Sequence, residues 1–323
     1  MKVSFMNLNV ILYNQDDIKN IIGCHNVNLK ALEQLFECSI DIHGDTIITN
    51  LEDESKIERL NEIFDLLLKM SQNHFNISPR DILYVNNVIA EGNVEKYLDF
   101  LNKRKPICRT HHGKPIYAKT LKQDEYVGAL KNKDLIFSIG AAGTGKTYLA
   151  VCYAVNELKS GNIEKIILTR PAVEAGESLG FLPGDLKEKV DPYLRPLYDA
   201  VHDMLGVEQT QSLIDKQVIE IAPLAYMRGR TLENAFIILD EAQNATIDQL
   251  KMFLTRMGFN SKMVVTGDIS QIDLPNSKKS GLKVSANLLK ELDEVEVIVF
   301  EKYDVVRHPL VGKIIEKFES LEN

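Results

Sequence analysis

The chain has 323 residues, of which 45% are hydrophobic and 26% charged, and its formal net charge is −8. These values are typical of a globular protein long enough for two domains, and the negative net charge argues against a protein that coats nucleic acid by bulk charge. No apolar run approaches the ~18 residues of a membrane helix, and the start of the chain lacks the apolar stretch of a signal peptide. We therefore expect a cytoplasmic protein with no membrane association. The four cysteines lie far apart without metal-ligand spacing, which argues against a zinc site and a disulfide framework.

Residues 1–75 predict a small α+β domain. Strands are expected at about 3–13, 38–43 and 46–50, and helices at about 15–23, 28–36 and 53–71. The order strand, helix, helix, strand, strand, helix is that of a KH domain, a fold that binds nucleic acid. Residues 76–105 are expected to form a helical connector whose first helix is N-capped by Ser78, with Pro79 at its first position.

The turn Gly23–Asn26 resembles the GXXG loop with which KH domains clamp a nucleic-acid backbone, but Asn26 replaces the second glycine. Asn tolerates a positive φ, so the turn can persist, although a close approach of the backbone to phosphate is less secure. Two interpretations stay open. The loop binds nucleic acid, or the KH-like fold serves packing or subunit contacts.

Residues 101–122 contain seven Lys or Arg and no Asp or Glu, and Pro106, Gly113 and Pro115 break any helix there. This composition predicts a linker and the boundary of a second domain, which we place at 106–323. Such a linker is either simply solvated or helps to follow a phosphate backbone.

The second domain begins with a phosphate-binding loop between a predicted strand, 135–139, and a predicted helix, 146–159. Backbone N–H groups of such a loop surround phosphate oxygens at a helix N-terminus. The lysine at its end reaches the β- and γ-phosphates of ATP, and the following hydroxyl binds Mg²⁺. The loop consists of Gly140, Ala141, Ala142, Gly143, Thr144, Gly145, Lys146 and Thr147.

Further strand-length apolar runs follow at 165–168, 218–221, 235–239, 263–265 and 295–300, with helices between them. This alternation predicts an α/β fold in which helices cover both faces of a parallel sheet, and ligands of such sheets bind at the carboxyl ends of the strands. Asp240 and Glu241 end one run and fit a Walker B element, in which Asp240 holds magnesium and Glu241 polarises the attacking water. Gln271 follows the next run and is expected to sense the γ-phosphate and position water.

Two further polar residues allow two interpretations each. Arg170 ends the 165–168 run, where it contacts a polynucleotide backbone or forms a buried salt bridge. Gln123 precedes the first strand of the second domain, where its amide reads the adenine edge or is an exposed residue at a helix start.

Six motifs in this order resemble the PhoH-like ATPases, bacterial proteins with a single helicase-like RecA core, over about residues 106–315. They are the run 138–150, which contains the phosphate loop, the block 168–186, and the runs 226–231, 239–243, 265–271 and 304–309. Ala141 departs from the proline that many relatives carry. The resemblance implies a P-loop NTPase fold, ATP hydrolysis, kinship with superfamily 1 helicases, ring oligomers with a hexamer favoured, and a role in RNA metabolism linked to a YbeY-type endoribonuclease.

A helicase motor normally takes its catalytic arginine from a second RecA domain, and this chain has only one predicted core. We therefore expect a neighbouring subunit to supply the arginine, with Arg307 as first choice and Arg228, Arg230 and Arg256 as alternatives. The expected function is an RNA-linked, helicase-like ATPase. The alternatives are a nucleotide-dependent scaffold or switch that recruits a ribonuclease without unwinding RNA, and a small-molecule kinase, which the separate strand-end motifs disfavour.

Overall fold

The structure is a computed structural model that describes residues 6–171, 186–274, 279–305, 314 and 317. The chain divides into two compact units, one containing the residues up to Arg104 and the other spanning Lys105–Val305. In the described residues, no helix combines the length and apolar character needed to cross a membrane.

The first unit contains an antiparallel sheet in the strand order β1-β3-β2. Its elements follow the predicted order: β1 (Met6–Ile11), α1 (Gln15–Ile22), α2 (Val27–Phe36), β2 (Ile40–His43), β3 (Thr46–Thr49) and α3 (Glu54–Gln72). Two further helices, α4 (Pro79–Ala90) and α5 (Val94–Lys103), complete it. The predicted cap of α4 is present as a capping box between Ser78 and Asp81.

The core of the first unit forms along one face of α3. Leu60, Phe64 and Leu67 recur at helical spacing and are completely buried, and each such side chain contributes about 1.5–3 kcal/mol by leaving water. Asp53 begins the helix by accepting hydrogen bonds from the N–H groups of Ser55 and Lys56. Apolar periodicity together with an N-cap therefore explains why this segment is a helix.

The turn between α1 and α2 has the backbone conformation that the sequence allows. Asn26, at the position of the second glycine, has φ 60°, and His25 before it has φ 54°. Gly23 has φ 75°, and a Cβ there would lie 2.8 Å from the side chain of the buried Asn28. Cys24, His25 and Asn26 are exposed, so the tip of the turn is open to solvent.

Within the described part of Lys105–Val305, six parallel strands form one sheet in the order β11-β6-β10-β9-β7-β8. The strands are β6 (Leu135–Ile139), β7 (Lys165–Arg170), β8 (Ile219–Pro223), β9 (Ala235–Leu239), β10 (Lys262–Gly267) and β11 (Val295–Val299). The predicted α/β fold with a parallel sheet is confirmed, and the predicted strands agree with the observed ones to within a few residues.

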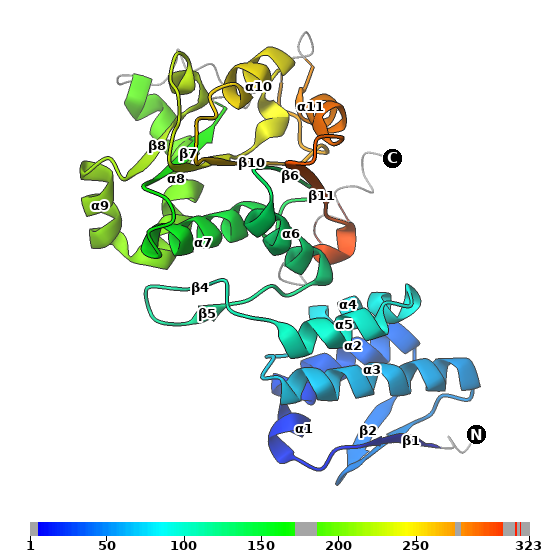
Figure 1. The fold of residues 1–323 in the computed structure, drawn as a ribbon. Helices are drawn as coiled ribbons and strands as arrows, with labels where there is room; N and C mark the ends of the chain where they lie inside the picture. Colours follow the sequence, from blue (N-terminus) through cyan, green and yellow to red (C-terminus); the bar gives the residue numbers. More distant parts are fainter. Residues whose placement is uncertain (1–5, 172–185, 275–278, 306–313, 315–316, 318–323) are drawn as a thin grey trace. The chain divides into compact units, whose positions relative to one another are not determined.

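Helices cover both faces of this sheet because successive side chains of its strands are apolar on both faces. Ile136, Phe236 and Ile238 pack with α6 (Leu121–Asn132), α7 (Lys146–Lys159) and α8 (Leu186–Leu205). On the opposite face, Phe137 and Ile237 pack with α10 (Ile247–Leu254) and α11 (Leu282–Leu289). Figure 1 shows these two helices across the sheet from α6 and α7. A further helix, α9 (Val207–Asp215), follows α8.

The predicted linker is more ordered than its composition suggests. It contains a short antiparallel hairpin, β4 (Cys108–Arg109) and β5 (Pro115–Ile116). Gly113 makes the turn with φ 78°, and the buried Cys108 contacts the sulfur of Met204 on α8 at 3.2 Å. Buried side chains in the basic segment therefore attach it to the second unit.

Candidate active site

The phosphate loop joins β6 to α7, and its shape depends on glycine. Gly143 and Gly145 have φ of 89° and 85°, conformations that other residues rarely adopt. At Gly140, a Cβ would lie 2.6 Å from that of Phe300, so a side chain there would displace the segment after β11. The loop can thus turn its N–H groups toward a common centre at the start of α7.

The ammonium group of Lys146 lies within its own loop. It donates to the carbonyl oxygens of Gly140 at 2.6 Å and Ala141 at 2.8 Å, and it lies 3.4 Å from the hydroxyl of Thr144. The residue is only 8% exposed. The positive charge of Lys146 is therefore already positioned beside the loop. A phosphate that binds there would replace the two carbonyl oxygens as its partner.

The helix before the sheet, α6, braces the loop from behind. Gln123 is buried at 3% exposure; its amide donates to the carbonyl of Thr144 at 2.9 Å and accepts from the N–H of Lys119 at 2.7 Å. Tyr126 donates to the carbonyl of Lys146 at 3.1 Å. Gln123 is thus neither an exposed helix start nor a free adenine-reading amide, because both ends of its amide bind the backbone of this chain.

A sequence signal for this arrangement was present. Thr120 and Gln123 have the spacing of a helix N-cap, and the hydroxyl of Thr120 accepts from the N–H of Gln123 at 3.1 Å. The capped start of α6 turns Gln123 inward toward the loop.

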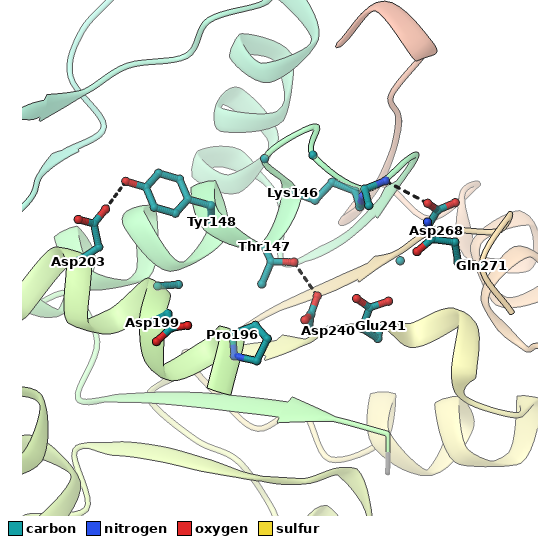
Figure 2. A pocket seen from close by; sticks show the side chains of 15 residues that line it. Lys146, Thr147, Tyr148, Pro196, Asp199, Asp203, Asp240, Glu241, Asp268 and Gln271 are labelled. Atoms are coloured by element: carbon teal, nitrogen blue, oxygen red, sulfur yellow. Dashed lines mark hydrogen bonds between the residues drawn. The ribbon is translucent and has the colours of Figure 1, made fainter. Parts of the chain in front are cut away.

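Oxygen ligands gather where the loop meets the ends of β9 and β10. The hydroxyl of Thr147 donates to Oδ1 of Asp240 at 2.6 Å (Figure 2). The hydroxyl of Thr266 donates to the same oxygen at 2.8 Å. The two hydroxyls lie 3.1 Å apart. Hydroxyl and carboxylate oxygens are the hard donors that Mg²⁺ prefers, so the residues present fit this ion. Thr266 belongs to a motif that the sequence singled out only for Gln271.

No group of three or more His, Cys, Asp or Glu side chains with metal-binding geometry occurs among the described residues. A magnesium ion that accompanies a nucleotide is held by one or two protein oxygens and by phosphate. The pair Thr147 and Asp240 matches that requirement without a larger cluster.

Glu241 follows Asp240 directly and has both carboxylate oxygens engaged. Its Oε1 lies 3.2 Å from Nη2 of Arg170, and its Oε2 accepts from the amide of Gln243 at 2.5 Å. Of the two interpretations of Arg170, the structure thus shows a salt bridge, and its partner is the predicted water-activating residue. The sequence did not identify this pairing.

The segment after β10 links Gln243 to the phosphate loop through Asp268. The amide oxygen of Gln243 accepts from the N–H of Asp268 at 3.0 Å, and Oδ2 of Asp268 accepts from the N–H of Ala142 in the phosphate loop at 3.0 Å. Gln271 is exposed and lines the same cavity as the loop. The structure therefore brings the three predicted strand-end and loop motifs together.

These groups line a cavity of about 590 Å³, within the usual range for small-molecule sites. Its described lining combines the loop, the acidic strand ends and one side of α8: Ala142, Gly143, Gly145, Lys146, Thr147, Tyr148, Pro196, Asp199, Ala200, Asp203, Asp240, Glu241, Gly267, Asp268 and Gln271. Five of these residues are acidic and one is a lysine. A polyphosphate would therefore need an accompanying cation.

The α8 side of the cavity was not predicted. Tyr148 donates to Oδ2 of Asp203 at 2.6 Å, as Figure 2 shows. Burial, followed by this hydrogen bond, raises the pKa of Tyr148, so the phenol stays protonated as a donor. Tyr148 comes directly after the phosphate loop, and that position was its only sequence signal.

The four arginines considered as the catalytic arginine of a neighbouring subunit differ in the contacts they make within their own subunit. Arg307 lies outside the described residues. Arg230 forms a bidentate pair with Glu220 at 2.6 and 2.7 Å, and this hydrogen bonding raises its pKa. Arg256 donates to the carbonyl oxygens of Met252 and Arg230, whereas Arg228 is exposed. Within one subunit, Arg230 and Arg256 thus have structural roles.

Comparison with known proteins identifies the family. A family model described as PhoH-like protein matches residues 115–319. A PhoH-like protein of Bacillus subtilis (strain 168) is 52% identical over 99% of both chains. A PhoH-like protein of Mycobacterium tuberculosis (strain ATCC 25618 / H37Rv) is 44% identical over 95% of this chain and 86% of the relative.

More distant similarities are partial. Protein PhoH of Escherichia coli (strain K12) is 45% identical over 63% of this chain and 58% of its own. The solved SWI2/SNF2 ATPase core of Sulfolobus solfataricus in complex with dsDNA has a TM-score of 0.30 and 13% identity, covering 45% of this chain and 31% of that one, which is too little to compare the folds. Because the family model matches more than half of the chain and a relative is 52% identical across nearly its full length, the chain belongs to the PhoH-like protein family.

Proposed function

We propose that the protein binds and hydrolyses ATP in RNA metabolism, as a relative of superfamily 1 helicases. The observation that carries the ATPase proposal is the 2.6 Å hydrogen bond between Thr147 of the phosphate loop and Asp240 at the end of β9, with Glu241 lining the same cavity. This juxtaposition supplies a phosphate cradle, oxygen ligands for a cation and a carboxylate base at one place.

Each group has one task in the proposed reaction. Lys146 exchanges its carbonyl partners for phosphate oxygens and offsets their charge. Thr147 and Asp240 would hold magnesium, which when bound neutralises charge that develops on the phosphates. Glu241 accepts a proton from the attacking water, and Gln271 orients that water.

RNA is the proposed partner because of the first unit. Its order of elements, the sheet order β1-β3-β2 and the exposed turn at Gly23–Asn26 match what a KH-like clamp on single-stranded nucleic acid requires. Asn26 supports the turn by adopting a positive φ. Any RNA cleavage would then belong to a partner, for which a YbeY-type endoribonuclease is our proposal.

We further propose a homo-oligomeric ring, with a hexamer favoured, in which Arg307 of one subunit completes the site of the next. The support is that the described part of the second unit contains one parallel sheet and hence one RecA-like core. A developing negative charge on the γ-phosphate is stabilised by an arginine, and in this proposal a neighbouring subunit supplies it.

The test is an ATPase assay with and without structured RNA, on protein whose oligomeric state is measured. Lys146→Ala is the matched control, because it removes the ammonium group that faces the phosphates. Hydrolysis that RNA stimulates and that Lys146→Ala abolishes supports the proposal. Hydrolysis without RNA stimulation favours the alternative, a nucleotide-dependent scaffold or switch that recruits a ribonuclease, and hydrolysis unchanged in Lys146→Ala rejects the assigned site.

A further inference from the structure

Arg170 and Glu241 leave neighbouring strands at the same edge of the sheet. Arg170 is the last residue of β7, and Glu241 follows β9 by two positions. The strands are paired up to Thr169 and Leu239, and the N–H of Asp240 donates to the carbonyl of Thr169 at 2.8 Å. The parallel register therefore fixes the arginine beside the glutamate.

Both carboxylate oxygens of Glu241 are held by side chains of the same subunit. One carboxylate oxygen lies 3.2 Å from the guanidinium of Arg170, and the other accepts from Gln243 at 2.5 Å. A general base needs an oxygen that can accept from the attacking water. In this arrangement each oxygen has one side-chain partner, so the direction of the lone pair that remains for water is fixed by Arg170 and Gln243.

The guanidinium is held from its other side by α8. Its Nη1 donates to the carbonyl oxygen of Tyr193 at 3.0 Å. Arg170 is not among the described residues that line the nucleotide cavity, whereas Glu241 is. Of its two partners named here, Tyr193 and Glu241, Glu241 is the one whose side chain lines the described cavity.

The backbone of Glu241 is constrained as well. With φ 52° and ψ 39° it occupies the left-handed region, which residues with a side chain rarely adopt and which persists where surrounding contacts impose it. The contacts of its carboxylate with Arg170 and Gln243 are such constraints. Their loss would permit a different arrangement of the carboxylate.

We propose that Arg170 is a positioning residue that holds Glu241 in a resting state, and that a phosphodiester of single-stranded RNA releases Glu241 by taking over the guanidinium. The released carboxylate then accepts the proton of the attacking water. The inference rests on the proposed ATPase function, which it deepens by naming the coupling between RNA and turnover.

Three observations make a phosphodiester the fitting ligand. The planar donors of a guanidinium match phosphate oxygens in pairs. Arg170 ends a parallel strand, where ligands of such sheets bind. The pair is also accessible, with 21% of the Arg170 side chain and 32% of the Glu241 side chain exposed, so its partners can exchange at small cost.

The experiment compares the intact chain with Arg170→Met, Arg170→Gln and Arg170→Lys. Methionine keeps apolar volume without charge, glutamine keeps a donor for the Tyr193 carbonyl, and lysine keeps the charge without the planar donors. Glu220→Gln is the matched control, because it breaks the Arg230–Glu220 pair one strand away, whose side chains are 37% and 34% exposed. The kcat and KM for ATP are measured with and without a single-stranded oligouridylate, and the melting temperature reports folding.

We expect Arg170→Met and Arg170→Gln to raise kcat without RNA about fivefold, the effect of losing one partly exposed ion pair, with KM unchanged. RNA should then raise the kcat of these two variants little. Wild type and Glu220→Gln should have a low kcat without RNA and a higher kcat with it. Arg170→Lys should lie between them. If Arg170→Met or Arg170→Gln folds and its kcat without RNA is unchanged or lower, the proposal that Arg170 restrains Glu241 is rejected.

The outcomes for wild type and Arg170→Met distinguish a failure of the ATPase function from a failure of the restraint by Arg170. If wild type does not hydrolyse ATP under any condition, the proposed function fails. If wild type hydrolyses ATP and Arg170→Met gains nothing, only the inference fails. A raised rate in Arg170→Met with no RNA response in any variant rejects RNA as the releasing ligand and retains the restraint.

Discussion

The side-chain amide of Gln123 donates to the carbonyl oxygen of Thr144 at 2.9 Å, which ties the middle of the phosphate loop to a helix that precedes the sheet. Thr144 and Gln123 are both buried, at 0% and 3% exposure. A buried carbonyl that loses its donor costs about 1–3 kcal/mol, so this bond is a substantial support for the shape of the loop.

Gln123→Glu tests this support. The carboxylate can still accept from the Lys119 N–H but cannot donate to the Thr144 carbonyl, so we expect a lower melting temperature and weaker binding of nucleotide. Because the amide shapes the loop, ATP and GTP affinities should fall together. Glu125→Gln on the same helix, which breaks the exposed Lys122–Glu125 pair, is the control. Loss of ATP affinity alone would instead restore the adenine-reading role.

Glu241→Gln and Asp240→Asn should separate chemistry from binding. Glu241→Gln keeps the size of the side chain but cannot take a proton, so ATP binding should persist while turnover falls roughly 10²-fold or more. Asp240→Asn should mainly weaken magnesium-dependent binding, because Asp240 is the carboxylate that contacts the Thr147 hydroxyl. Binding is measured by titration with a fluorescent ATP analogue, and wild-type turnover in Glu241→Gln would show that another group activates water.

Removal of magnesium should weaken the binding of ATP as well as stop its hydrolysis. The cavity lining carries five acidic residues against Lys146, and a polyphosphate adds further negative charge. With EDTA in place of Mg²⁺, we expect ATP affinity to fall at least about tenfold, since the repulsion is no longer offset. Calorimetric titration with and without the ion measures this, and equal affinities would contradict the assignment of Thr147 and Asp240 as ligands.

A composite site predicts complementation between inactive subunits. Arg307→Ala removes the proposed neighbouring arginine and Glu241→Gln removes the base, so each protein alone should be nearly inactive. In a mixed oligomer, some interfaces combine an intact Glu241 with an intact Arg307, and activity should partly return. Mixtures no more active than their parents, or a fully active monomer at high dilution, would assign Arg307 a structural role.

The parts of the site that the sequence predicted are those made by neighbours in the chain. The phosphate loop depends on glycines and a lysine at fixed spacing, and Asp240 and Glu241 directly follow an apolar run that β9 reproduces, Ala235–Leu239. Local spacing determines these features. Their arrangement at one edge of a parallel sheet then follows from a general rule.

The contacts between strands could not be predicted in the same way. Arg170 meets Glu241 because β7 lies beside β9, although β8 lies between them in sequence. Gln243 reaches Asp268 because β9 lies beside β10. No motif spacing encodes this strand order, so the sequence left two interpretations of Arg170 and assigned no role to Gln243 or Asp268.

The hydrogen bond from the Ala142 N–H to Asp268 places a carboxylate of the chain itself on the phosphate loop. This carboxylate is a tethered competitor, and tethering over short distances gives effective concentrations in the millimolar range or above. Dialysis or dilution cannot remove it. A phosphate that bound the Ala142 N–H would have to displace this carboxylate, so the measured affinity would be lower than that of an open loop.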